Sequence, residues 1–334
     1  MILVTGGTGL LGSHLLYDLL KAGKDVTAIR RSGKHMPEVR EVFNYYDGDP
    51  AALLEKVRWV EADMLNFQDM LEVMDGVSEV YHCAAIVSFD PALHARMIKS
   101  NTDGTANLVN AALESNVRKF LHVSSTAAIG KPVGDKVADE TLIWTESKSN
   151  TGYSISKFRS EMEVWRGIQE GLNAVIVNPS IILGPGFWDH GSSSIFKKID
   201  NGLKFYSNGV TGYVGVWDVV RIMMQLMESE ISEERFLVTA ENLTYREVFN
   251  KVADELGRKR PAIEGTKFMS ELAWRADWLM SKGLRIGEHT FTKERVRAAR
   301  NIVRYDNAKV RNTLDFEFEP VDNVIKKVVG YYRK

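Results

Sequence analysis

Short apolar runs alternate with amphipathic segments through the first half of the chain. The apolar runs, rich in Val and Ile, predict strands at residues 2–4, 25–29, 57–60, 77–83, 119–123 and 174–177. The segments with helical periodicity predict helices at residues 10–22, 66–74, 102–114 and 152–171. Strands that alternate with helices predict a parallel sheet covered by helices on both faces.

The pattern changes after Pro179. Loops rich in Gly and Ser come first, and the later predicted elements are a strand at residues 236–239 and helices at residues 245–256 and 294–304. We expect an α/β protein with a doubly wound parallel sheet in residues 1–180 and a smaller C-terminal α/β lobe in residues 181–334. A return of residues 210–240 to the main domain is left open.

The composition argues against several kinds of partner, cross-link and location. Of the 334 residues 44% are hydrophobic, and the formal net charge of −1 offers no field to attract nucleic acid, so none is expected as a partner. Cys83 is the single cysteine, which excludes an intramolecular disulfide and suits a reducing cytosol. Met1 leads directly into a predicted strand and no apolar run is long enough for a membrane span, so we expect a cytoplasmic protein without an integral membrane segment.

A glycine-rich turn, Thr5-Gly6-Gly7-Thr8-Gly9-Leu10-Leu11-Gly12, separates the first predicted strand from the first helix. Gly6 allows a tight turn, Gly9 lets the backbone approach a pyrophosphate, and Gly12 lets the helix pack closely against the strand. The free N–H groups at the start of the helix would bind the phosphates. A turn without a ligand is the alternative, but the order strand, turn, helix and strand is that of a Rossmann-type dinucleotide-binding domain.

The end of the second predicted strand indicates which dinucleotide is bound. NAD-binding domains usually have an acidic residue there, which binds the ribose 2′-hydroxyl. This chain has Arg30 and Arg31 instead, and guanidinium groups attract a 2′-phosphate. The sequence therefore favours NADP(H) as the cofactor, and NAD(H) is the alternative if the two arginines are merely solvated.

Tyr153 and Lys157 are four residues apart and share one face of a predicted helix. A nearby cation favours phenolate, which makes Tyr a usable proton donor or acceptor. Tyr17 and Tyr305 also precede a lysine by four residues, but Tyr153 alone follows a strand that ends in hydroxyl residues, Ser124-Ser125-Thr126. Ligands bind at the carboxyl ends of such strands.

With these elements in order, the chain resembles the extended short-chain dehydrogenase/reductase family, also called the NAD-dependent epimerase/dehydratase family. The resemblance covers essentially the whole chain and is closest to dihydroflavonol-4-reductase-like reductases. Beyond the glycine turn, the matching motifs are Asp63-Met64, His82-Cys83-Ala84-Ala85, Asn101, Gly104-Thr105, Ser124-Ser125, Tyr153 with Lys157, and Asn178-Pro179-Ser180.

The resemblance implies a role for each motif. Tyr153 would be the general acid or base, Lys157 would lower its pKa, and Ser125 would bind the substrate oxygen, with Ser124 and Thr126 as alternatives to Ser125. The residues implied in binding the cofactor are Gly6, Thr8, Gly9, Leu10, Leu11, Gly12, Arg30, Asp63, Met64, Ala84, Ala85, Tyr153, Lys157 and Pro179. Those implied in binding the substrate are Phe89, Ser125, Thr126 and Tyr153.

The expected activity is NADP(H)-dependent reduction of a small carbonyl compound. Aromatic residues near the predicted pocket, such as Phe89, Phe187, Trp188 and Phe196, favour an apolar or aromatic substrate unless they belong to the core. A nucleotide-sugar epimerase or dehydratase with tightly bound NAD is the first alternative, although Ile129 stands where such enzymes often have Tyr. A non-catalytic NADP-sensing protein is the second alternative.

Two further expectations concern metals and partners. The histidines are scattered and Cys83 lacks neighbours at ligand spacing, so no metal site is expected. The relatives imply a possible homodimer through the helices at residues 102–114 and 152–171. The role of an amphipathic segment around Trp274 and Trp278 is left open.

Overall fold

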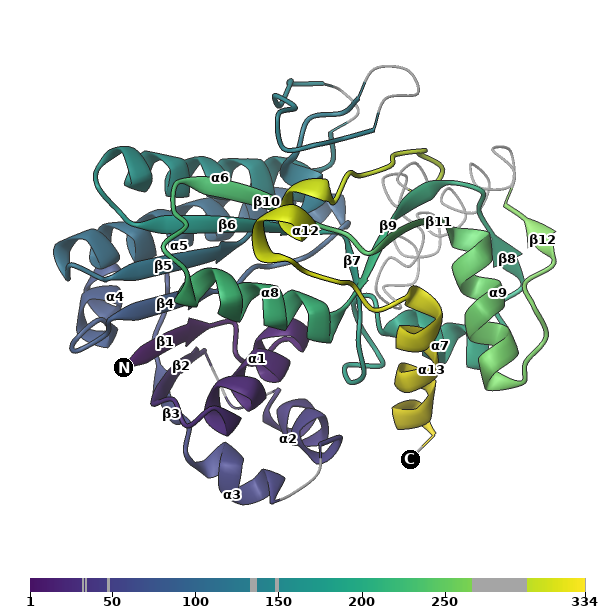
Figure 1. Cartoon of the computed structure of the whole chain (residues 1–334), viewed down its shortest axis with the longest axis horizontal. Coiled ribbons are helices and arrows are strands. Elements are labelled where there is room, and N and C mark those ends of the chain that lie inside the picture. The colour runs from purple at the N-terminus through teal and green to yellow at the C-terminus, as the bar shows by residue number, and fades with distance from the viewer. Residues whose placement is uncertain are drawn as a thin grey trace.

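A computed structural model describes residues 1–31, 33, 35–46, 49–132, 137–147, 150–265 and 299–333. These residues form a seven-stranded parallel sheet with helices on both faces (Figure 1). In spatial order the strands are β10 (Glu234–Val238), β6 (Ala174–Pro179), β5 (Lys119–Val123), β4 (Glu79–His82), β1 (Ile2–Thr5), β2 (Val26–Arg30) and β3 (Arg58–Glu61). The expected doubly wound α/β fold is confirmed, and the strand order reverses between β1 and β4.

The helices lie in two layers because the strands bury side chains on both faces. Ile2 and Val4 of β1 belong to the core shared with α1 (Leu10–Lys21) and α8 (Val216–Glu228). Leu3 points to the other face, into the core shared with α4 (Phe67–Val73), α5 (His94–Glu114) and α6 (Gly152–Gln169). The remaining elements on this part of the chain are α2 (Met36–Asn44), α3 (Pro50–Glu55), α12 (Ala308–Leu314) and the 3₁₀ turns η1 (Pro91–Leu93) and η2 (Thr126–Ala128).

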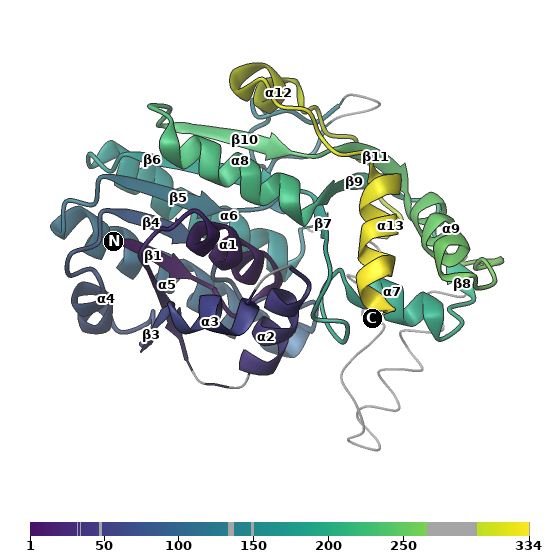
Figure 2. The same cartoon turned by 60° about the horizontal axis from the view of Figure 1, so that its bottom comes forward.

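A second body of structure lies beyond the carboxyl ends of the main strands. A small mixed sheet contains β7 (Ile181–Leu183), β9 (Val210–Gly215) and β11 (Glu241–Thr244), and a two-stranded sheet contains β8 (Phe205–Tyr206) and β12 (Ile263–Glu264). The helices packed there are α7 (Ser194–Asp200), α9 (Tyr245–Leu256) and α13 (Val321–Tyr332). Both views show α9 and α13 side by side next to the small sheet (Figures 1 and 2). Strand β10 lies between β9 and β11 in the sequence, but it pairs with β6 of the main sheet.

Helix α9 has the bounds predicted from the sequence, and its local signals explain why. The Thr244 hydroxyl accepts a hydrogen bond from the Glu247 N–H, and the Glu247 side chain binds the Thr244 N–H in return. Gly257 ends the helix in the left-handed conformation. The predicted helix at residues 294–304 is wrong over its described part, because residues 299–304 form a turn and an extended segment that bridges to Val210. Trp274 and Trp278 lie outside the described residues.

The burial of the edge strand β10 against the core can be tested with Phe236. Its side chain is fully buried, so Phe236→Ala should leave a cavity and lower the free energy of unfolding by about 3–5 kcal/mol. Phe205→Ala is the matched control, because that ring is 43% exposed and its loss should cost no more than about 0.5 kcal/mol. Equal destabilisation of both variants in urea would contradict this account of the core.

Candidate active site

The carboxyl ends of the parallel strands bring the predicted motifs to one edge of the main sheet. Strand β1 leads into the glycine turn, β4 into Ala84 and Ala85, and β5 into the serine pair. The strand order reverses between β1 and β4, and in open α/β sheets a ligand cleft lies at such a reversal. The site is therefore built around these strand ends.

The glycine turn packs too closely against its surroundings to carry side chains. Gly6 has φ +72°, and a Cβ there would come within 2.6 Å of the Ala84 nitrogen. A Cβ at Gly12 would lie 2.1 Å from the Gly6 oxygen. Helix α1 begins after Gly9, which has no side chain to cap it, so its first N–H groups remain available to an anion.

The two leucines of the turn point into the protein, whereas Thr8 is half-buried in the turn itself. Leu11 belongs to the core between the sheet and α8, and Leu10 packs against the cluster of Val42, Tyr45 and Phe187. A dinucleotide at this turn would therefore meet the backbone of Leu10 and Leu11.

Arg30 lies at the carboxyl end of β2, as expected. Its guanidinium is 3.4 Å from a Glu61 carboxylate oxygen, and its Nε is buried without a hydrogen-bond partner among the described residues. Asp63, after β3, is exposed and accepts a hydrogen bond from the Leu65 N–H, and the Met64 carbonyl accepts one from Asn107 of α5. The guanidinium thus has capacity for a further acceptor.

Hydrogen bonds hold the loop after β4 in place, and the sequence did not reveal them. The Thr5 hydroxyl accepts from the Ala84 N–H and binds Nδ1 of His82 at 2.7 Å, and Nε2 of His82 binds the Thr105 hydroxyl at 2.9 Å. Asn101 of α5 accepts from the Ile86 N–H and donates to the Ile86 carbonyl. Burial lowers the pKa of His82 to about 3, so the imidazole is neutral and bridges β4 to its neighbours.

Tyr153, Ser125 and Lys157 come together at the next strand end. Tyr153 lies in the first turn of α6 and forms a hydrogen bond with the Ser125 side chain, and the Phe89 ring lies 5.8 Å from the Tyr153 ring. Lys157 donates a hydrogen bond to the Val123 carbonyl at 3.0 Å. The three side chains and Phe89 are therefore neighbours.

The electrostatics of this group are dominated by burial. Burial lowers the pKa of Lys157 to about 8, because the ammonium is less well solvated there. Burial raises the pKa of Tyr153, and the hydrogen bond with Ser125 offsets part of that shift. The net shift of the Tyr153 pKa is thus opposite to the lowering that the family resemblance implies.

The three hydroxyl residues after β5 have different partners. The Ser124 hydroxyl donates to the buried carboxylate of Glu161 at 2.6 Å, and Thr126 forms a hydrogen bond with Tyr305. Ser125 is the one bonded to Tyr153. This arrangement favours Ser125 over the two alternatives as the group that would meet a substrate oxygen.

The two other Tyr-x-x-x-Lys pairs have different surroundings. Tyr17 is buried and stacks on Tyr46 with ring centroids 3.7 Å apart, as expected for a core residue. Tyr305, which does not follow a strand ending in hydroxyl residues, nevertheless reaches the site, where its hydroxyl contacts Thr126 and Thr211. No local signal in the sequence could place it there, because residues 299–333 return across the small lobe.

Several predicted pocket aromatics belong to the core instead. Phe196 is fully buried between helices of the small lobe, and Phe187 is buried against α2. Trp188 donates its Nε1 hydrogen bond to Glu41 of α2. Phe89 is the predicted aromatic residue that contacts Tyr153.

Three possible metal ligands, not expected from their spacing, lie near one another at the start of α2. His35, Glu38 and His190 place their ligating atoms within 4.8 Å of one another. His35 and Glu38 already interact at 3.3 Å as neighbours on one helical turn.

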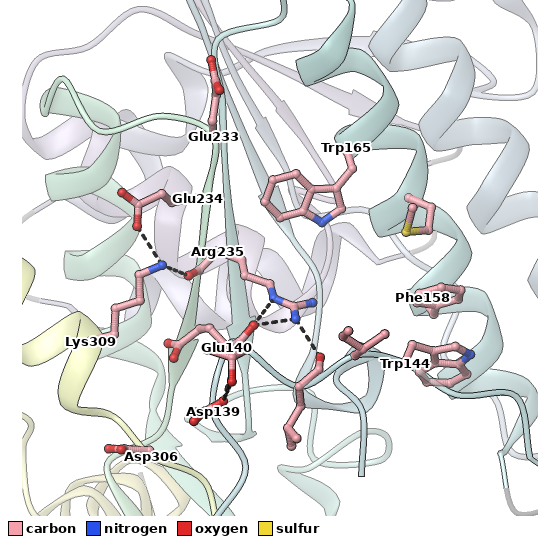
Figure 3. Close-up of a pocket in the computed structure, with 14 residues that line it drawn as sticks. Asp139, Glu140, Trp144, Phe158, Trp165, Glu233, Glu234, Arg235, Asp306 and Lys309 are labelled. Carbon is pink, nitrogen blue, oxygen red and sulfur yellow. Dashed lines mark hydrogen bonds and ion pairs between the residues drawn. The ribbon is translucent and has the colours of Figure 1, made fainter. Parts of the chain in front are cut away.

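A pocket of about 750 Å³ lies on the outer side of α6 (Figure 3). Trp144, Phe158 and Trp165 form one wall, and Glu234 and Lys309 lie on the opposite side. Its lining residues include none of Ser125, Tyr153 and Lys157. The pocket is thus distinct from the site at the strand ends.

Fold and site together define a dinucleotide-binding α/β protein with a Ser, Tyr and Lys group at the sheet edge. The model of the NAD dependent epimerase/dehydratase family matches residues 2–238, and the chain belongs to this family. Its members of the extended short-chain type are NAD(P)-dependent dehydrogenases, reductases and epimerases, and this chain is such an enzyme. Homologues include dihydroflavonol 4-reductase-like and cinnamoyl-CoA reductase proteins, which confirms the resemblance inferred from the sequence.

Three comparisons illustrate the relationship. Sterol demethylase protein B of Methylococcus capsulatus is 31% identical over 268 residues, which cover 78% of this chain and 76% of that protein. Cinnamoyl-CoA reductase 1 of Petunia hybrida is 29% identical over 257 residues, 74% of either chain. The crystal structure of gox2253 has a TM-score of 0.80 and 25% sequence identity, covering 100% of this chain and 98% of that one. Among the described residues, no helix is long and apolar enough to cross a membrane.

The close packing of the glycine turn can be tested by adding one methyl group. Gly12→Ala should push α1 away from the turn, because the Gly6 backbone oxygen cannot accommodate a Cβ 2.1 Å away. We expect NAD(P)H affinity, measured by fluorescence titration, to fall by about tenfold or more, which is roughly 1.4 kcal/mol.

Gly330→Ala is the control for that experiment. Gly330 lies within α13, and a Cβ there would meet no atom within 4 Å. Its affinity for the cofactor should stay unchanged, and its stability should rise slightly because Ala favours helix more than Gly. Unaltered affinity in Gly12→Ala would show that the turn does not bind the phosphates.

Proposed function

We propose that this protein is an NADP(H)-dependent oxidoreductase that reduces a small, apolar or aromatic carbonyl compound to an alcohol. The observation that carries the proposal is the contact between the hydroxyls of Tyr153 and Ser125, with Lys157 on the next turn of the same helix. The group lies at the sheet edge that also carries the glycine turn. We assign cofactor binding to residues 1–180 and most of the substrate pocket to residues 181–334.

The chain would contribute binding and proton chemistry. The glycine turn would bind the diphosphate, Ala84, Ala85 and Pro179 would flank the nicotinamide end, and Asp63 and Met64 would meet the adenine. A bound nicotinamide supplies the hydride that adds to the carbonyl carbon. Tyr153 would donate its proton to the carbonyl oxygen, which Ser125 and Thr126 stabilise as negative charge develops. Lys157 would bind the ribose and hold its ammonium charge near the phenol.

The surroundings support an apolar substrate. Phe89 lies against the Tyr153 ring, and the relatives that share most of the chain include a cinnamoyl-CoA reductase, whose name indicates an aromatic substrate. A nucleotide sugar needs polar partners for its hydroxyls. An epimerase with tightly bound NAD is the alternative, and it predicts purified protein that retains NAD+ and consumes no NADPH with any carbonyl compound.

Tyr153→Phe tests the assigned chemistry. Removing the hydroxyl should reduce carbonyl turnover by about 10³-fold or more, because the developing alkoxide loses its proton donor, whereas NADPH affinity should stay within about twofold. Steady-state kinetics and cofactor titration measure both quantities.

Tyr17→Phe is the matched control, because Tyr17 also precedes a lysine by four residues but lies in the core. Its turnover should remain near that of the parent protein. Comparable turnover in Tyr153→Phe and the parent would sink the mechanism.

Arg30→Asp tests the choice of cofactor. The new carboxylate would repel a 2′-phosphate and could bind a ribose 2′-hydroxyl, so the ratio of kcat/KM for NADPH to that for NADH should fall by about 10²-fold. Arg58→Asp makes the same charge change at the exposed amino end of the neighbouring strand β3 and should leave the ratio unchanged. A preserved NADPH preference in Arg30→Asp would count against Arg30 as the residue that binds the 2′-phosphate, and a preference for NADH in the parent protein would count against NADP(H).

A further inference from the structure

Glu161 is a buried carboxylate one helical turn after Lys157 on α6. It has no role in the reaction proposed above. Its side chain is 3% exposed. One oxygen, Oε2, accepts hydrogen bonds from the Ser124 hydroxyl at 2.6 Å and from Nδ2 of Asn178 at 2.7 Å. Burying a carboxylate costs free energy unless hydrogen-bond donors replace the lost water, and these donors do so for Glu161.

The second oxygen of Glu161 faces the edge of the sheet. Oε1 accepts hydrogen bonds from Trp165 Nε1 at 3.3 Å and from Arg235 Nη1 at 3.1 Å. The same guanidinium donates to the carbonyls of Glu140 and Leu142, as Figure 3 shows. The carboxylate thus joins α6 and β10, and through Arg235 it joins the loop at residues 139–142.

These contacts converge on the segment that carries Ser125. Nδ2 of Asn178 also donates to the Ser125 carbonyl at 3.1 Å, and Lys157 donates to the Val123 carbonyl. With the bond from Ser124 to Glu161, the last residue of β5 and the two serines after it are each held by a side chain of α6 or β6. Because Tyr153 lies on α6 too, the same contacts fix Ser125 relative to the phenol.

We propose that Glu161 is a positioning residue, which holds Ser125 against Tyr153 and provides the negative charge that faces the Lys157 ammonium. The inference rests on the proposed function, because it gives a purpose to the geometry of the Ser125, Tyr153 and Lys157 group. Glu161 itself touches neither substrate nor cofactor in this scheme.

Among the described residues, the other titratable groups around Lys157 supply no comparable negative charge near neutral pH. Burial lowers the pKa values of His82 and His122, so both imidazoles are neutral, and burial raises the pKa of the Cys83 thiol to about 12. The pKa of Tyr153, on the same helix, is also raised. A Cys83 thiolate and the Glu161 carboxylate both favour the ammonium form of Lys157, but the raised pKa of Cys83 keeps that thiol protonated near neutral pH.

Loss of the Glu161 charge should lower the pH at which Lys157 loses its proton. Without the Glu161 charge, the Lys157 pKa would fall further below its value of about 8, because burial would act with less compensation. Activity that needs the protonated amine would then be lost at a lower pH on the alkaline side.

Glu161→Gln tests this role, with Glu163→Gln as the matched control on the same helix. Glu163 is exposed enough to pair with Arg166 at the surface. For Glu161→Gln we expect kcat to fall roughly 10- to 100-fold, whereas KM for the carbonyl substrate should change less than about twofold. In a plot of kcat against pH, the fall on the alkaline side (the alkaline limb) should move to lower pH. Glu163→Gln should match the parent protein in all three quantities.

Ser124→Ala covers the case in which Glu161→Gln does not fold. It removes one donor and leaves the carboxylate with its other three, so kcat should fall by less than in Glu161→Gln while the alkaline limb stays in place. Parental kcat and an unmoved alkaline limb in Glu161→Gln would overturn the inference, as would parental kcat in Ser124→Ala if the glutamine variant is unfolded.

Failure of the proposed function would give a different result. A parent protein that binds NADPH but reduces no carbonyl compound would overturn the reductase assignment alone. The pH dependence of NADPH affinity then decides on Glu161, since Lys157 is assigned to the ribose. A limb that moves to lower pH in Glu161→Gln supports the inference, and an unmoved limb overturns it.

Discussion

The backbone after β1 touches the loop after β4 so closely that no side chain fits between them. A Cβ at Gly6 would lie 2.6 Å from the Ala84 nitrogen, and the Thr5 hydroxyl binds the same nitrogen at 3.2 Å. Since the strand order reverses between these two strands, this contact lies where a ligand is expected to bind in an open α/β sheet. The open N-terminus of α1, the small residues after β4 and the site at the end of β5 all take their positions from it.

Polar side chains that are buried near this contact need hydrogen-bond partners inside the protein. These partners determine the geometry of the site. His82 satisfies both ring nitrogens with Thr5 and Thr105, and so links β4 to β1 and α5. Glu161 does the same for α6, β5, β6 and β10. In contrast, His122 has no hydrogen-bond partner among the described residues and packs 4.9 Å from the His82 ring as a neutral group. Such networks rigidify a site because each member loses several bonds if it moves.

The main sheet could be predicted because each of its first six strands contains a short apolar run and the first five precede helical segments. The observed bounds of these six strands differ from the predicted ones by at most two residues. The two-stranded sheet could not be predicted, because β8 and β12 have two residues each and lie far apart in the sequence. Helix α8 was missed although its buried residues, including Val219, Val220, Met223 and Met227, recur with helical spacing. Helix α5 begins eight residues earlier than predicted, because its first two turns are mostly polar and show no apolar periodicity. Asn101, for example, has its partners at Ile86 and Ser156, far away in the sequence.

The candidate catalytic residues, like the strands of the main sheet, can be found from local sequence motifs, but the residues that surround them cannot. Tyr153, Lys157 and the serine pair occur within 34 residues of sequence, and local motifs reveal them. Tyr305 is held by Asn242, whose side chain binds both its N–H and its carbonyl, and by a bridge to Ala138. Its hydroxyl contacts Thr126 and Thr211, next to Ser125. Three segments distant in sequence therefore meet beside Ser125 and Tyr153. Under the proposed function these returning segments would shape the substrate pocket, whereas the fold positions the Ser, Tyr and Lys group, so that one fold could serve different substrates.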